Sequence, residues 1–221
     1  VLIRAKLTIS GNGLTSQTTT VYYSADNLPP GGMVGMTLQA DGTILGGTTR
    51  LPTGIYTWQL ELQAGYEDEV NSTDPDKFTS LGTAHTMQGR QEVVNFKDSA
   101  LGENWNLVGL NRLTIAGNDV MLVQADGQSA TFRGQNGGYR TPAGYTSVLE
   151  KHVVEGVTTY TLTDKNRTVE TYNAAGQLVS REDIHGNRTL YAYSGTRLVT
   201  MTDPLGRVTS FSYHATTGLL T

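Results

Sequence analysis

The sequence DIHGNRTLYAY at residues 183–193 is followed, after nine residues, by the similar sequence DPLGRVTSFSY at residues 203–213. Both stretches begin with an aspartate, carry a glycine at the fourth position and end on two aromatic residues that one residue separates. A more divergent copy precedes them, so that Tyr172, Tyr193 and Tyr213 align with spacings of 21 and 20 residues. A fixed period of this length indicates one supersecondary unit that is repeated along the chain.

Each repeat is predicted to form a β-hairpin. Two short runs of alternating residues fill the period, together with a D-x-x-G turn before the aromatic strand and a glycine, then a leucine, after it. Side chains alternate along a strand, so Thr189, Tyr191 and Tyr193 fall on one face, and Thr209 and Phe211 repeat the pattern. Because isolated hairpins are marginally stable, we expect them to lie side by side in one sheet.

The repeated aspartates and aromatic residues each have a functional alternative. Asp164, Asp183 and Asp203 recur with the hairpin period, which favours a turn role in which the carboxylate accepts backbone N–H bonds. The alternative is a pair of carboxylates for glycoside hydrolysis. The aromatic ladder is predicted to pack the sheet face. Its alternative is stacking on sugar rings, with Tyr191 as the residue to test.

The first hundred residues predict a separate β-sandwich. Residues 2–10 alternate strictly, and the side predicted to face inward holds Ile3, Ala5, Leu7 and Ile9. Residues 18–25, 55–62 and 91–96 predict further strands, with Trp58 in the core. Short strands at close spacing, with turn residues between them, are typical of a sandwich.

Two turn signals and one acidic loop separate these strands and those that follow. Asp41-Gly42 suits a type I′ hairpin turn, and Asp126-Gly127 predicts a second hairpin. Residues 67–76 are acidic and polar, which predicts a solvated loop. The alternative is a cation site built from Asp68, Asp74 and Asp76, although the spacing of a calcium loop is missing.

Composition supports an all-β chain and excludes several kinds of protein. Glycine makes up 26 of the 221 residues and charged residues only 16%, which is typical of a turn-rich β protein. A net charge of −4 argues against nucleic-acid binding. Cysteine is absent, which excludes disulfides and thiolate metal sites, and no apolar run is long enough for a transmembrane helix. The start at Val1 and the end at Thr221, inside a repeat, predict a piece of a larger protein.

Motifs of catalysis or metal binding are not found, so we expect no catalytic residue, metal ligand or cofactor. The histidines have no ligand spacing and are predicted to be exposed polar residues: His85, His152, His185 and His214. The sequence has no G-x-S-x-G, no phosphate-binding G-x-x-x-x-G-K-[ST] and no H-E-x-x-H. Glycosylation sequons, which matter only in a eukaryotic secretory host, begin at Asn71, Asn166 and Asn187.

The repeats resemble the YD repeats of the RHS family. Their loose pattern, G-x-x-T-x-Y-x-Y-D followed by G-x-L and D-x-x-G, is matched by GNRTLYAYSGTRLVTMTDPLGRVTSFSYHATTGLL at residues 186–220. LGENWNLVGLNRL at residues 101–113 is similar to the stretch that leads into the first repeats of large bacterial RHS proteins. The resemblance continues through ADGQSATF, YRTPAGYTSVLEK and TYTLTDKNRTVETYNAAGQL, and it covers about residues 98–221.

The sequence departs from the family pattern at two places. The aspartate that follows the tyrosine is replaced by Asn173, Ser194 and His214 in the three copies, so its role is not required here. The first aromatic residue of the pair is missing from the first copy, where Glu170 stands in its place.

The resemblance implies the start of a long β-sheet that spirals into a hollow shell, as in bacterial toxin-related RHS proteins and the teneurins. Residues 1–97 are then a β-sandwich domain, and residues 98–221 are the start of the hairpin array. We expect a non-enzymatic scaffold segment of a secreted or cell-surface bacterial protein, whose partners are further repeats and an enclosed C-terminal cargo. The alternative is an adhesive module that binds glycan or a neighbouring cell. Because the chain ends inside a repeat, residues 208–221 are expected to leave an open sheet edge that pairs or frays.

Overall fold

A computed structural model describes residues 1–12, 14–24, 38, 51–68, 77–97 and 99–221 of the chain. The chain divides into two compact units, the first made of Val1–Leu51 with Ile55–Val93 and the second of Pro52–Gly54 with Val94–Thr221. Among the described residues every regular element is a β-strand, and the strand pairs are antiparallel. The predicted all-β class is therefore confirmed.

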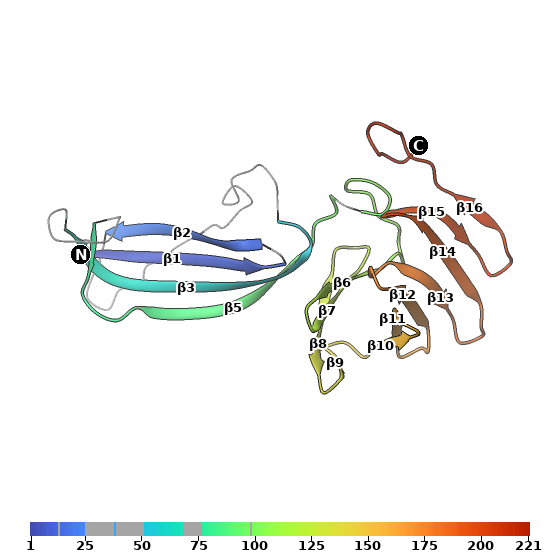
Figure 1. The fold of residues 1–221 in the computed structure, drawn as a ribbon, viewed down its shortest axis with the longest axis horizontal. Helices are drawn as coiled ribbons and strands as arrows, with labels where there is room; N and C mark the ends of the chain where they lie inside the picture. Colours follow the sequence, from blue (N-terminus) through green and yellow to red (C-terminus); the bar gives the residue numbers. More distant parts are fainter. Residues whose placement is uncertain (13, 25–37, 39–50, 69–76, 98) are drawn as a thin grey trace. The chain divides into compact units, whose positions relative to one another are not determined.

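The first unit contains one sheet among its described residues. Its strands run in the order β2-β1-β3-β4, and β5 also pairs with β3. Figure 1 shows β2, β1, β3 and β5 side by side. Their bounds are β1 Leu2–Gly11, β2 Leu14–Ser24, β3 Gly54–Glu67, β4 Phe78–Ser80 and β5 His85–Val93. The second layer of a sandwich stays a prediction. The expected turn at Asp41-Gly42, the sequon at Asn71 and two of the loop aspartates, Asp74 and Asp76, lie outside the described residues.

The alternation predicted for β1 is only partly expressed as burial. Ala5 is fully buried, but the other residues of its face are half-buried: Ile3, Leu7 and Ile9. Trp58 is also half-buried, and its predicted place in a sandwich core stays a prediction, as the second layer does. Its ring lies against Gly89 of the neighbouring strand β5, where an added Cβ would stand 2.6 Å from the ring. The indole therefore covers the bare backbone of a strand in its own sheet.

The second unit begins with a loop and a four-stranded sheet. Its strands follow chain order and comprise β6 Arg112–Ala116, β7 Asp119–Val123, β8 Ser129–Gln135 and β9 Gly138–Arg140. The hairpin predicted at Asp126-Gly127 joins β7 to β8, where the N–H of Gly127 donates to the carbonyl of Gln124 at 3.1 Å. Strand β7 is the most buried of the four, because four of its five residues are buried.

The repeats form a seven-stranded sheet in which each strand pairs with the next along the chain (Figure 1). Its strands are β10 Val148–Val154, β11 Val157–Thr163, β12 Val169–Asn173, β13 Leu178–Glu182, β14 Arg188–Ser194, β15 Arg197–Thr202 and β16 Val208–Ser210. The first two copies of the repeat are the hairpins β12–β13 and β14–β15. The predicted row of adjacent hairpins is therefore confirmed.

A β-bulge recurs at the same place in both hairpins. Thr171 pairs with Ser180 but Tyr172 pairs with Leu178, which leaves Val179 as the extra residue. Val199 is the extra residue in the next hairpin, where Tyr193 pairs with Leu198. A bulge bends its strand and increases the local twist. The repeat therefore specifies the curvature of the sheet as well as its turns.

The aromatic face of the seven-stranded sheet packs against the four-stranded sheet. Tyr172, Leu178 and Leu198 have no exposed surface, and they belong to one hydrophobic core. The four-stranded sheet contributes buried side chains to the same core: Leu113, Val120, Leu122 and Phe132. Tyr191, Tyr193 and Phe211 pack at the margin of this core, and the packing role predicted for the aromatic ladder is confirmed.

The two sheets of this unit are also joined through the backbone at Gly176. The N–H of Leu113, on β6, donates to the carbonyl of Gly176 at 2.8 Å, and Arg112 forms a bridge with Gln177. Gly176 has a φ of +78° and is buried, and a Cβ at this position would stand 2.0 Å from the carbonyl oxygen of Leu113. Only glycine allows this approach of the two backbones.

Gly176→Ala is therefore expected to destabilise the second unit by about 2–4 kcal/mol, the sum of left-handed strain and overpacking. Gly186 is the matched control, because it has a similar φ of +79° and nothing within 4 Å of an added Cβ. Gly186→Ala should cost only about 1 kcal/mol for its backbone conformation. Urea unfolding of the two variants measures the difference, and equal losses would contradict the close contact.

Candidate functional site

The aspartates proposed as alternative catalytic residues lie in the hairpin turns. The N–H groups two and four residues along the chain donate to Oδ1 of Asp164, Asp183 and Asp203 at 2.8–2.9 Å. The backbone closes each turn as well, because the N–H of each aspartate donates to the carbonyl four residues later. Each carboxylate therefore accepts hydrogen bonds from backbone N–H groups that would otherwise bond to water. The predicted turn role is confirmed.

Asn173 makes the same kind of turn at the opposite end of the strands, between β12 and β13. Its Oδ1 accepts the N–H groups of Ala175 and Gln177, both at 3.0 Å. Asn173 stands where the family pattern has its aspartate, so an amide oxygen performs the bonding that a carboxylate oxygen performs at Asp183. His214 begins a wider turn at the corresponding position, where its Nδ1 accepts the N–H of Thr217 at 3.2 Å.

The carboxylates of Asp183 and Asp203 are held in their charged form by hydrogen bonds. Hydrogen bonds from Asn187 hold the pKa of Asp183 below its usual range. The backbone N–H of Arg207, and then its side chain, lowers the pKa of Asp203 in the same way. A carboxylic acid that protonates a leaving group needs a raised pKa. These two carboxylates have the opposite shift.

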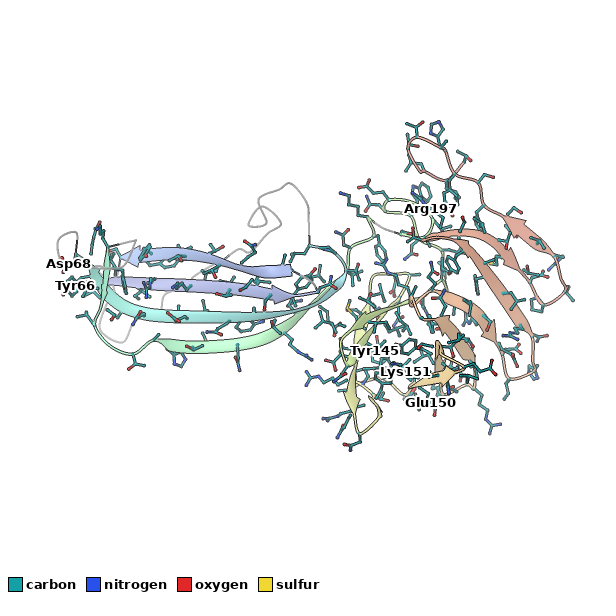
Figure 2. All side chains as sticks on the ribbon, in the orientation of Figure 1. Tyr66, Asp68, Tyr145, Glu150, Lys151 and Arg197 are labelled. Carbon is teal, nitrogen blue, oxygen red and sulfur yellow. The ribbon has the colours of Figure 1, made fainter. Side chains whose placement is uncertain are left out.

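The other residues considered for chemistry are dispersed. The four histidines are exposed, as predicted, and no three acidic or histidine side chains gather around a possible cation among the described residues. Asp68 follows directly after β3 (Figure 2), where its N–H donates to the carbonyl of Lys77 at 2.7 Å. The cation alternative for the acidic loop stays untested, because its other two aspartates lie outside the described residues.

A buried polar cluster lies on β12, where the first copy departs from the repeat pattern. Glu170 is only 7% exposed. Both of its carboxylate oxygens accept from Nδ2 of Asn111 at 3.1 Å, and the hydroxyl of Tyr172 donates to Oε2 at 2.5 Å. Nε of Arg181 stands 3.8 Å from Oε1. Burial, and then the neighbouring carboxylate, raises the pKa of Tyr172 well above its usual range, so this tyrosine stays a proton donor.

The cluster attaches the loop before β6 to the first repeat. Asn111 lies 59 residues before Glu170 in the chain, and the carboxylate occupies the place where the next two copies have Tyr191 and Phe211. Removing either partner would leave a buried polar group unpaired, which is costly. The sequence showed that a glutamate stands in place of an aromatic residue. It did not indicate that Asn111 would be its partner.

A cavity of about 460 Å³ lies beside β6 in the same unit. Leu113 and Ile115 line it together with Gly176, Gln177 and Tyr193. Two of its polar side chains bond to the protein itself. Arg112 donates to Thr53 Oγ1 at 2.7 Å and to the Asn95 carbonyl at 3.0 Å, and Gln177 donates to the Gly195 carbonyl at 2.8 Å. These groups serve the fold.

The first unit has a shallower polar site on its sheet. A groove of about 600 Å³ is lined by hydroxyl and amide side chains around Trp58. Ser10 and Thr57 share a hydroxyl hydrogen bond of 2.8 Å, and Thr8 and Thr18 share one of 3.0 Å. Such cross-strand pairs stabilise a sheet.

Comparison with known proteins adds no family. The chain matches no family model, no curated protein and no solved structure. In the part of the chain that the structure describes, no helix has the length and apolar character needed to cross a membrane.

Tyr172→Phe is expected to lower the free energy of unfolding by about 1–3 kcal/mol, because the buried carboxylate of Glu170 loses a donor. Tyr193→Phe is the control, since the Tyr193 hydroxyl makes no hydrogen bond to a described residue, and it should cost about 0.5 kcal/mol or less. A double-mutant cycle with Glu170→Gln should give a coupling above about 0.5 kcal/mol. Equal losses for the two phenylalanine variants, with no coupling, would show that the cluster has no energetic role.

Proposed function

We propose that the chain is a non-enzymatic structural segment of a large secreted or cell-surface RHS-type protein of bacteria. In this proposal the seven-stranded sheet is part of a β shell or scaffold that encloses or presents a C-terminal cargo. The resemblance of the repeats to the RHS family supplies the class of protein. The observation that carries the proposal is that the repeated residues close the turns of the sheet and pack its buried face.

Each residue that defines the repeat supports a structural role. The aspartates accept backbone N–H groups in the turns, and Leu178 and Leu198, which are fully buried, pair with Tyr172 and Tyr193 across the bulged strands. Tyr213, in the third copy, donates to the carbonyls of Ala100 and Leu198 at 2.9 and 2.5 Å. A unit in which some residues close turns and others pack against the neighbouring unit can be repeated many times with the same contacts. An extended β-sheet scaffold requires this property.

The curvature of the sheet gives further support. Bulges at Val179 and Val199 recur in the first two hairpins, and a bulge bends its strand and increases the local twist. The four-stranded sheet packs against the face of the first hairpins that holds Tyr172, Leu178 and Leu198. It supplies the apolar surface that the first hairpins need, because a hairpin without a packed face is marginally stable.

The proposal is tested on the full-length protein by limited proteolysis of its C-terminal region. Deletion of residues 98–221 should make that region protease-sensitive, and Gly176→Ala should shift cleavage in the same direction at temperatures near the unfolding of the segment. Gly186→Ala, which keeps the junction between the sheets, should leave the cleavage pattern unchanged. Protection of the C-terminal region that survives the deletion would contradict the scaffold role.

A second candidate function, adhesion to glycans, has one observation in its favour. Trp105 is 61% exposed in the loop before β6, near Val108, which is 95% exposed. An exposed indole can stack on a sugar ring or anchor a protein partner. The tyrosines considered for this role are less suitable, because Tyr172 is buried and Tyr191 packs at the margin of the core.

Adhesion predicts saturable binding on a glycan array that Trp105→Ala abolishes. Tyr191→Phe is the control, because it keeps the ring at the core margin and should bind as the unmodified chain does. Absence of saturable binding, or equal binding by Trp105→Ala, would contradict adhesion through this loop.

A further inference from the structure

The hairpin formed by β8 and β9 (Figure 1) places two arginines directly opposite each other. Arg133 pairs with Arg140 in the register of this hairpin, and both residues are exposed. Opposite residues of an antiparallel pair have Cβ atoms about 5 Å apart, and like charges at such a position destabilise the sheet. Neither arginine forms an ion pair or a hydrogen bond with a described residue. The hairpin therefore holds two neighbouring positive charges that the described part of the chain does not neutralise.

One carboxylate does reach this hairpin, but it bonds to the backbone. Asp119, at the start of β7, accepts the N–H of Gly134 with its Oδ1 at 3.0 Å. It forms no ion pair with Arg133 or Arg140. The repulsion between the two arginines is thus not relieved by the acid that lies at the neighbouring strand.

The rest of the same hairpin face is polar and open. Gln135 shares a side with Arg133, because alternate residues of a strand point the same way. Gln135 pairs with Gly138, and a Cβ added to Gly138 would meet only the carbonyl oxygen of Gln135, at 3.9 Å. The side-chain amide of Gln135 makes no hydrogen bond to a described residue. Two guanidinium groups and one amide therefore lie around a position where no side chain stands.

The number of donors and the charge indicate which ligand fits this face. Each guanidinium presents a planar fork of N–H groups that matches the oxygens of a carboxylate or a phosphate. One fork already occupies both oxygens of a carboxylate. A phosphate monoester has three free oxygens and a charge of about −1.5 to −2 at pH 7. It can accept from both forks and from the amide, and its charge balances the two arginines.

We propose that Arg133, Arg140 and Gln135 form a binding site for a phosphate monoester group. The two guanidinium groups bind its oxygens, the amide of Gln135 donates to it, and the bare backbone at Gly138 leaves room for the esterified group. The bound dianion converts the repulsion between the arginines into attraction to a shared partner. The site lies within one hairpin of the second unit, so it is independent of the scaffold role.

The test compares two esters of the same shape, methyl phosphate and methyl sulfate, added to the complete chain at pH 7.5 and constant ionic strength. NMR signals of the arginine Nε–H groups and of the backbone amides of residues 133–140 should shift saturably with methyl phosphate. Methyl sulfate, which also has three free oxygens but only one charge, should bind at least about fivefold more weakly. Glucose 6-phosphate and O-phosphoserine then compare a sugar phosphate with a phosphorylated side chain, and tighter binding of either supports the site and names its source.

Arg140→Gln should weaken the binding of methyl phosphate by about tenfold or more, because one charged fork is lost. Arg140→Lys keeps the charge without the fork and should weaken binding by about threefold. Arg188→Gln is the control, since it removes the same charge from an exposed arginine that already has an acidic partner, Glu182, at 3.9 Å. It should bind as the unmodified chain does, and thermal unfolding verifies that each variant is folded.

Three results would overturn the proposal. They are the absence of a saturable shift with methyl phosphate, equally tight binding of methyl sulfate, and equal losses for Arg140→Gln and Arg188→Gln, which would indicate attraction to the general charge of the chain. None of them affects the proteolysis test of the scaffold role.

Discussion

In each of four turns of the seven-stranded sheet, one side-chain oxygen accepts two backbone N–H groups. The register of the sheet depends on these hydrogen bonds. Asp164, Asp183 and Asp203 supply this oxygen in the turns at one end of the strands, and Asn173 supplies it in a turn at the other end. A turn of constant length fixes which residues face each other across a hairpin. A slip of one residue would move every side chain to the opposite face. Because the turns prevent this slip, the tyrosines and their leucine partners lie on one side of the sheet.

The second constraint is the junction between the two sheets of the repeat-containing unit. The carbonyl of Gly176 accepts the N–H of Leu113. The carboxylate of Glu170 accepts from Asn111, which lies two residues before Leu113 in the chain. Both contacts bind the first repeat to the segment around β6, but only the glutamate departs from the repeat pattern, because every copy carries a glycine after its tyrosine. A buried glutamate replaces an aromatic residue, and a glycine excludes any side chain. The start of the row is therefore specialised for docking, whereas the later copies are specialised for pairing with their neighbours.

Sequence reasoning succeeded where the physics was local. The alternation of Thr189, Tyr191 and Tyr193 gave the correct face, and the period of the aspartates gave the correct turns. It did not predict that the ring of Trp58 lies against Gly89 of a neighbouring strand in its own sheet. Alternation shows which side chains share a face, but not what lies opposite that face. It also treated Asn173 as the loss of a functional aspartate, although an amide oxygen makes the same two hydrogen bonds.

The sequence by itself determined the all-β class, the hairpin period, the turn residues and the division of each repeat strand into two faces. Strand alternation and turn chemistry act between residues a few positions apart, and the period appears when copies 20 and 21 residues apart are compared. Only the tertiary structure decided that Glu170 meets Asn111, that Leu113 reaches Gly176 and that the tyrosine ladder is covered by a second sheet. The contact between Glu170 and Asn111 joins residues 59 positions apart. Their partners are chosen by the packing of two sheets, and no periodicity in the chain encodes that choice.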